Sequence, residues 1–383
     1  MPRSGSARSA DDRRWPDFIA LGVLTRVFPP DVVDAALIEC GRVERRDRLL
    51  PARFVVYYVL SLALFAPSSY EEVMRKVTAG LEWALGWPHQ RVVPTKAALF
   101  QARKRLGPEP LRVLFDKVAV PLADPRFPGG FYRSWRLMSV DGSTLELPGS
   151  EANVEQFGPP SSSVGPSLPR MRVIGLIECG SRAVIDVAFG TCGQNEQTLT
   201  ESLVRSLRPG MLLIADHAPL CRRLCRSSGA DLLWRTDAAL PVEKWCSDGS
   251  FESRVNPVTG GYTQGRDGIA VRVIEYSPAT SGADTVGGGE RTGRLLTTIT
   301  DPTAAPADEL VGVHAQQRDV ETLFGVLATH RRGAGAVLRS KSPDGVIQEL
   351  YSYLCVHNAV RSMMQWSGVP GLVTADSSPH RVK

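Results

Sequence analysis

Hydrophobic and polar positions in the first third of the chain follow the period of an α-helix. The pattern predicts helices over 17–28, 31–40, 54–66, 68–86 and 93–107. The third of these is apolar on all sides, but its 13 residues fall short of the roughly 20 that a membrane span needs. We therefore expect a buried helix there, within an all-helical N-terminal domain over residues 15–120. The polar, Arg-rich residues 1–14 are expected to be disordered.

After a Pro- and Gly-rich joint at 121–132 the alternation changes to that of strands. One strand, or a strand broken at Asp141-Gly142, is predicted over 135–147. The pattern then predicts, in order, a hairpin (171–180 and 183–190), a helix (196–210), an apolar strand (211–216), a β-rich stretch (223–305), helices over 306–366, and a loose polar tail (367–383). Such an order is typical of an α/β or α+β fold.

Charge and composition add a partner class to this picture. The chain is 43% hydrophobic and 22% charged with a net charge of +5, as in a soluble globular protein. Residues 1–110 hold 17 Lys+Arg against 12 Asp+Glu, so this third accounts for the whole excess. A basic third favours a partner that carries phosphates, although a solvated helical surface explains the charge equally well. Seven cysteines with no CxxC pair indicate reduced thiols in the cytoplasm.

The helix over 93–107 is the candidate for DNA contact. Thr95 is its expected N-cap and Gly107 its stop. Its predicted exposed positions are Lys96, Gln101, Arg103, Lys104 and Arg105, residue types that contact phosphates and base edges. Two interpretations stay open: a recognition helix in a DNA groove, or a basic surface helix that packs on its neighbours.

Two acids end apolar strands. Asp141 follows Leu137, Met138 and Val140, and Asp216 ends the run 211–216. An uncompensated buried carboxylate costs several kcal/mol, so each acid needs a partner, solvent or a cation. Carboxylates from neighbouring strands suit Mg²⁺, and a third acid from a helix would complete a two-ion site for phosphoryl transfer. A single acid at a strand end is more often a loop cap.

Several long motifs resemble the insertion-sequence-four-type DDE transposases over roughly residues 16–366. They are "SVDGSTLELPGSEANVEQFG" (139–158), "RPGMLLIAD" (208–216), "ADLLWRT" (230–236) and "THRRGAGAVLRSKSPDGVIQELYSYLCVHNAVRSMM" (329–364). The resemblance implies an α/β (α+β), ribonuclease-H-like mixed sheet with flanking helices over 126–222 and 306–366, interrupted by a β-rich insertion over 223–305.

The same resemblance implies the chemistry and the partners. Asp141, Asp216 and Glu321 would be catalytic ligands of Mg²⁺, with Mn²⁺ as a substitute. The partners would be double-stranded DNA, namely the terminal inverted repeats and the target, and a second copy of the chain in the synaptic complex. A bacterial, cytoplasmic protein without a membrane partner is expected.

The residues around the third acid depart from the family motif Tyr-x-x-Arg-Trp-x-x-Glu with a Lys seven positions later. His314, Gln317, Arg318 and Ala328 stand at the Tyr, Arg, Trp and Lys positions, and His217-Ala218-Pro219 replaces Arg-Gly-aromatic. Arg318, His330, Arg331 and Arg332 are candidates to grip DNA instead. Two hypotheses follow: an active transposase, or a weakened or inactive descendant that still binds DNA.

Overall fold

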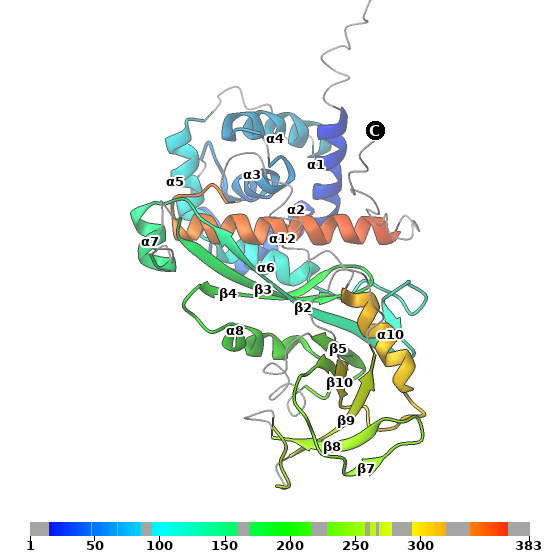
Figure 1. The fold of residues 1–383 in the computed structure, drawn as a ribbon. Coiled ribbons are helices and arrows are strands. Elements are labelled where there is room, and N and C mark those ends of the chain that lie inside the picture. The colour runs from blue at the N-terminus through cyan, green and yellow to red at the C-terminus, as the bar shows by residue number, and fades with distance from the viewer. Residues whose placement is uncertain are drawn as a thin grey trace, which may run out of the picture. The chain divides into compact units, whose positions relative to one another are not determined.

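A computed structural model describes residues 15–46, 48–66, 68–85, 94–159, 168–215, 228–256, 261–265, 268–277, 293–318 and 338–366. The chain divides into two compact units, coloured along the chain in Figure 1. The helical unit comprises Met1–Val120, Glu146–Pro169 and Leu338–Lys383, and the sheet unit comprises Pro121–Leu145 and Arg170–Val337.

The helical unit is built around α3, whose residues 54–62 are all buried. An all-round apolar helix has no face for water, so it must lie inside a bundle. The long C-terminal helix α12 packs on α3 and α6, and α4 packs on α1 and α3 (Figure 1). The helices are α1 (Trp15–Val27), α2 (Pro30–Glu39), α3 (Ala52–Leu64), α4 (Tyr70–Leu85), α5 (Lys96–Leu106), α6 (Glu109–Val118), α7 (Glu151–Phe157) and α12 (Pro343–Trp366).

The sheet unit holds one mixed sheet, with ten strands among the described residues, in the order β4-β3-β2-β5-β6-β10-β9-β8-β7 and with β1 beside β2. The pairs β2–β5 and β5–β6 are parallel, whereas β3–β4 and the pairs from β6 through β10 to β7 are antiparallel. The strands are β1 (Phe131–Tyr132), β2 (Trp135–Glu146), β3 (Arg170–Glu178), β4 (Val184–Thr191), β5 (Met211–Ala215), β6 (Asp231–Arg235), β7 (Lys244–Trp245), β8 (Phe251–Val255), β9 (Ile269–Tyr276) and β10 (Gly293–Thr297).

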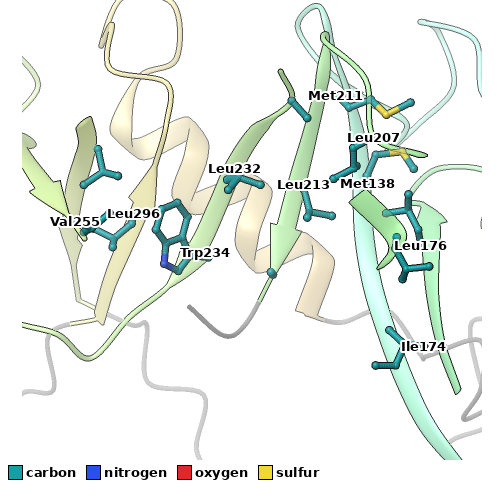
Figure 2. Packing of buried hydrophobic residues seen from close by; sticks show 14 of the residues in the cluster. Met138, Ile174, Leu176, Leu207, Met211, Leu213, Leu232, Trp234, Val255 and Leu296 are labelled. Carbon is teal, nitrogen blue, oxygen red and sulfur yellow. The ribbon is translucent and has the colours of Figure 1, made fainter. Parts of the chain in front are cut away.

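Each face of this sheet carries its own apolar cluster. On the α8 face, Met138 and Leu213 pack with Leu199 of α8 (Glu196–Ser202) and with Leu203 of the short 3₁₀ helix Leu203–Ser206. Figure 2 shows this cluster along the strands from Ile174 to Val255. On the α10 face, Leu137, Leu212 and Ile214 pack with Leu310 of α10 (Ala307–Arg318). The alternation of strand side chains sends neighbouring residues to opposite clusters.

The predicted fold class, a mixed α/β sheet with flanking helices and a helical N-terminal part, is confirmed. The stretch 135–147 forms one strand, and the hairpin and the buried strand form as predicted. The helix predicted over 196–210 is shorter, because α8 ends at Ser202 and tightens into a 3₁₀ turn before Pro209.

Two predicted domain boundaries differ from the structure. Residues 223–305 were expected to be an insertion, but β6 pairs in parallel with β5 and so belongs to the central sheet. Residues 306–366 were expected in the catalytic core, but α12 groups with the helical unit. The sequence pattern shows that α12 has an apolar stripe and does not show which surface that stripe covers.

No helix in the described parts of the chain combines the length and the apolarity that crossing a membrane requires.

Candidate active site

Asp141 lies on β2, which continues through this residue without a break. Leu137 packs in the α10-face cluster and Met138 in the α8-face cluster. Because strand side chains alternate, Asp141 falls on the same face as Leu137, four residues before it. The residue is half-buried. Its carboxylate therefore belongs to the face that α10 covers.

The neighbouring strand β5 is in parallel register with β2. Arg136 lies opposite Met211 and Ser139 opposite Ile214, so the register is constant along the paired residues. Leu212 and Ile214 point to the α10 face. β5 ends at Ala215. Asp216, the second predicted acid, is the next residue in the sequence and lies outside the described residues.

The helix α10 lies over this face of the sheet. Leu310 is fully buried in the α10-face cluster, and His314, one turn later, is 2% exposed. The helix ends at Arg318, and the side chains of Gln317 and Arg318 are not described. Glu321, the third predicted acid, lies three residues beyond, outside the described residues.

The first turn of α10 is held by side chains from the end of β1 and from the turn that follows it. Tyr132 Oη donates to Glu309 Oε2 at 2.7 Å, and Arg133 donates to both Glu309 oxygens at 3.1 and 2.9 Å. Arg133 also donates to the carbonyls of Thr303 and Ala304. It adopts a left-handed φ of 51°, which costs about 1–2 kcal/mol for a residue with a side chain. The bonds to α10 and to the turn before it offset that cost.

Ionisation at this anchor follows from the same contacts. Hydrogen bonds from Arg133 and then Tyr132 lower the pKa of Glu309 below its ordinary value. Burial, and then the hydrogen bond to Glu309, raises the pKa of Tyr132. The pair is therefore a neutral phenol that donates to a charged carboxylate at neutral pH.

A second anchor comes from the β7–β10 extension. Asp248, in the turn between β7 and β8, accepts from the backbone N–H of Ala307 at 3.0 Å, where α10 begins. The fully buried Arg272 on β9 lies 3.6 Å from Asp248 and donates to the carbonyl of Ala305. Burial lowers the pKa of Arg272, and Asp248 opposes that shift. Residues of β9 and of the β7–β8 turn, at the far end of the same sheet, thus fix the start of α10.

The predicted DNA-contact helix, α5, belongs to the helical unit. Thr95 Oγ1 accepts from Ala98 N at 3.2 Å and caps its start, and Gly107 ends it with a φ of 69°. Lys96, Gln101 and Lys104 are exposed. Lys96 lies 3.3 Å from Glu71 of α4 in a solvent-exposed pair.

The prediction that Arg103 is an exposed position on α5 is wrong. Its side chain is 12% exposed and lies 3.6 Å from the buried carboxylate of Glu349. It also donates to Gln348 at 3.0 Å, to Ser340 at 2.9 Å and to the carbonyl of Gly345 at 3.0 Å. The guanidinium therefore holds α5 against the start of α12. A sequence signal existed, since Arg103 follows the buried Leu99 by four residues and so shares its helical stripe.

The remaining predicted site residues fall outside the described residues: His330, Arg331 and Arg332 entirely, and Arg318 beyond its backbone. Within the described ranges, no three His, Cys, Asp or Glu side chains gather in a way that would hold a metal ion. Sequence reasoning missed both anchors of α10, because Tyr132, Asp248 and Arg272 come from three distant segments.

Comparison with known proteins shows which family model and which proteins this chain resembles. The model of the insertion element 4 transposase N-terminal domain matches residues 18–116. The transposase InsG for insertion sequence element IS4 of Escherichia coli (strain K12) is 24% identical over 353 residues, covering 88% of this chain and 74% of that protein. A putative transposase InsZ of the same organism is 21% identical over 191 residues, covering 49% of this chain and 61% of that protein.

Among solved structures, a piggyBac transposase synaptic complex with hairpin DNA is similar, with a TM-score of 0.45 and 10% identity, over 92% of this chain and 75% of that one. The family match covers α1 to α6, and the InsG match extends over most of the chain, including the sheet unit. The chain therefore matches the insertion element 4 transposase family over its N-terminal domain and is similar to an insertion-sequence transposase of that type over most of its length.

Proposed function

We propose that this protein is a DDE transposase that cuts the ends of its insertion element and joins them to target DNA. Asp141, Asp216 and Glu321 form its catalytic site. Water attacks a phosphodiester at the element end, and the freed 3′ hydroxyl then attacks a phosphodiester of the target. The phosphodiester count is conserved in the joining step, so no further energy source is needed.

The observation that carries this proposal is the register of β2 and β5. Ser139 of β2 lies opposite Ile214 of β5. In the sequence, Asp141 is two residues after Ser139, and Asp216 is two residues after Ile214. If the pairing continued by those two positions, Asp141 would lie beside Asp216. Both positions share parity with the α10-face residues Leu137 and Leu212, so both carboxylates would be on one face.

The spacing along α10 supports Glu321 as the third acid. Leu310 and His314 mark the stripe of α10 that is buried. At 100° per residue, position 321 falls about 20° from position 310 around the helix axis. A helix continued by one turn would therefore aim Glu321 at the same sheet face as the two aspartates.

The donor set fits a hard divalent cation. Carboxylate oxygens are the ligands that Mg²⁺ prefers, and Asp141 is half-buried on β2, where a cation would offset the cost of its burial. Mg²⁺, or Mn²⁺ in its place, would supply Lewis-acid stabilisation of the phosphate and activation of the attacking oxygen. The chain's own contribution is to fix the acids, through the sheet register and the two anchors of α10.

DNA recognition is assigned to the helical unit, with Lys96, Gln101 and Lys104 of α5 as contacts to the terminal repeats. The exposed cations on a capped helix support this role. Near the catalytic acids, the DNA backbone would be bound by Arg318, His330, Arg331 and Arg332. Because two element ends must be cut and joined together, we expect a homodimer on DNA.

The test is cleavage of a supercoiled donor that carries the flanking terminal repeats, with Mg²⁺ or Mn²⁺. Asp141→Asn should eliminate cleavage and preserve DNA binding, because an amide is a much poorer ligand for Mg²⁺ than a carboxylate. Glu146→Gln is the matched control, since it neutralises an exposed acid on the same strand. Equal activity of Asp141→Asn and wild type would contradict the proposal.

The altered residues around Glu321 favour a second candidate, a weakened or inactive descendant that binds DNA. A positioned Arg or Lys commonly supplies a factor of ten or more in phosphoryl transfer. If the enzyme is only weakened, Gln317→Arg with Ala328→Lys should raise its cleavage rate at least tenfold. If wild type and this double variant both bind the repeats tightly but neither cuts them, the chain is a DNA-binding remnant.

A further inference from the structure

An exposed aromatic ring lies in the middle of the basic face of α5. Phe100 is 52% exposed, and Lys96 and Lys104 lie one turn before and after it. Gln101 is the exposed neighbour on the same side. The helix has no acid in its 11 residues, and three of its four cations, Lys96, Lys104 and Arg105, are exposed, whereas Arg103 is bonded inward. The exposed face of α5 therefore combines an aromatic ring with two cations at one-turn spacing.

The opposite side of α5 is fixed, so Phe100 cannot turn inward. Leu99, Ala102 and Leu106 are buried in the helical unit. Arg103 is bonded to Gln348, Ser340 and Gly345 near the start of α12, and Gln348 donates back to the carbonyls of Arg103 and Gly107 at 2.8 and 2.9 Å. Thr95 caps the start of the helix. The unit thus presents Lys96, Phe100, Gln101 and Lys104 as a rigid outward face.

We propose that Phe100 contacts the methyl group of a thymine in the major groove and is a specificity-determining residue. This inference rests on the proposed role of α5 in binding the terminal repeats. The thymine C5-methyl is the apolar group that base pairs present in the major groove, and Phe is among the side chains that contact it. Lys96 and Lys104, on either side, would bind the flanking phosphates and hold the helix in register.

The charges on this face favour DNA over a protein partner. Lysine is depleted at the centres of protein interfaces, whereas here two lysines border the ring at one-turn spacing. An α-helix fits the width of the major groove, and the exposed lysines of α5 complement the phosphates on both sides of it. The partner is therefore double-stranded DNA with a thymine at the step that the ring faces.

The experiment begins with selection of preferred sites by the full-length chain from a pool of random-sequence duplexes. Each thymine of the selected site is then replaced singly by deoxyuridine, which removes only the methyl group. At one thymine, wild-type binding should weaken about fourfold, the equivalent of about 0.8 kcal/mol for one buried methyl. Phe100→Ala should weaken binding to the unmodified site by at least as much.

The decisive result is the coupling between the two changes. Phe100→Ala should bind the thymine and deoxyuridine sites equally at that position, because the ring that would touch the methyl is gone. Ile38→Ala, which truncates another exposed apolar residue of the helical unit, should retain the fourfold discrimination. Phe100→Ala should also leave the salt dependence of binding unchanged, whereas Lys104→Ala should reduce the slope by about one unit.

Three results would overturn the inference. Additive effects of Phe100→Ala and deoxyuridine at every thymine would mean that the ring does not touch a methyl. A loss of self-association by Phe100→Ala with no change in DNA selectivity would assign the ring to a protein interface. If the protein selects a DNA sequence and alanine substitutions at Lys96, Phe100 and Lys104 do not change its binding, then α5 is not in the DNA interface. That result would leave the catalytic proposal unaffected.

Discussion

At the scale of one residue, Arg103 is a charged residue whose side chain lies mostly inside the helical unit. Its guanidinium lies beside Glu349, whose side chain is 4% exposed, and the surrounding hydrogen bonds satisfy both groups. Glu349 accepts from Ser340 Oγ at 2.6 Å and from the N–H of Arg339 at 2.7 Å. A buried ion pair with this many partners tolerates desolvation, but either partner alone does not.

Removal of one partner should therefore be severe. Arg103→Met should lower the free energy of unfolding by about 3–5 kcal/mol, because it leaves the Glu349 carboxylate buried and unpaired. Chemical denaturation followed by circular dichroism measures this change. Lys104→Ala, on the exposed neighbouring position, should change stability by less than about 0.5 kcal/mol. Pairing Arg103→Met with Glu349→Met should recover part of the loss, and a strictly additive double variant would argue against a coupled pair.

At the scale of an element, α10 is fixed from two sides at its start. Tyr132 and Arg133 hold Glu309, and Asp248 caps the N–H of Ala307. An acid in the first turn also interacts favourably with the helix dipole. Under the proposed function, in which Glu321 is the third acid, these anchors would help to position it, since Glu321 follows the last residue of α10, Arg318, by three positions.

The Glu309 anchor predicts a specific pH dependence. The folded-state pKa of Glu309 is lowered, so the stabilisation is present above the ordinary glutamate pKa of about 4.3 and is lost as the pH falls through the folded value. Glu309→Gln should therefore lower Tm at pH 7, and its difference from wild type should shrink as the pH is lowered from about 5 toward 3. Thermal unfolding over a pH series measures this.

Asp308→Asn is the matched control for that series. It removes an exposed charge from the same turn of α10, with the same position relative to the helix dipole. Its effect on Tm should be small and should show little pH dependence above pH 4. A Glu309→Gln difference that stays constant down to pH 3 would mean that the carboxylate is not the group that stabilises the anchor.

At the scale of the whole molecule, each unit is assembled from segments that are far apart in sequence. The helical unit takes its first six helices from the N-terminus and α12 from residues 343–366. Val346, Leu350 and Leu354 of α12 are buried. Asn358 donates to the carbonyl of Val118 at 3.1 Å. The N-terminal helices alone would expose the surface that α12 covers.

A fragment of residues 1–120 should therefore not fold stably on its own. Each large apolar side chain that α12 no longer covers forfeits up to about 1.5–3 kcal/mol of burial, which is large against the roughly 5–15 kcal/mol of an ordinary domain. Circular dichroism should show reduced helix content without a cooperative thermal transition. Addition of a peptide of residues 338–366 should restore the transition. A cooperative fragment without the peptide would show that α12 is dispensable.

Much of the local structure of this protein is determined by its sequence alone. The alternation around Met138 and Leu213 predicts the strands, the all-round apolar segment 54–66 predicts the central helix, and Thr95 and Gly107 predict the ends of α5. These features depend on side chains that are only a few residues apart, so they can be predicted from the periodicity of hydrophobic and polar residues. The sequence alternation also places Asp141 in a strand, although β2 continues to Glu146 and does not end at this acid as the apolar run suggests.

Only the tertiary structure decided which surfaces meet. The register between β2 and β5, the parallel addition of β6 to the sheet, and the packing of α12 on α3 and α6 all join distant segments. A helical pattern shows that Arg103 shares a stripe with Leu99, but its partner Glu349 lies near the other end of the chain, on α12. An amphipathic stripe must be buried against something, and the free energy of burial is much the same for any apolar partner. The choice of partner is therefore settled by the fit of the whole assembly.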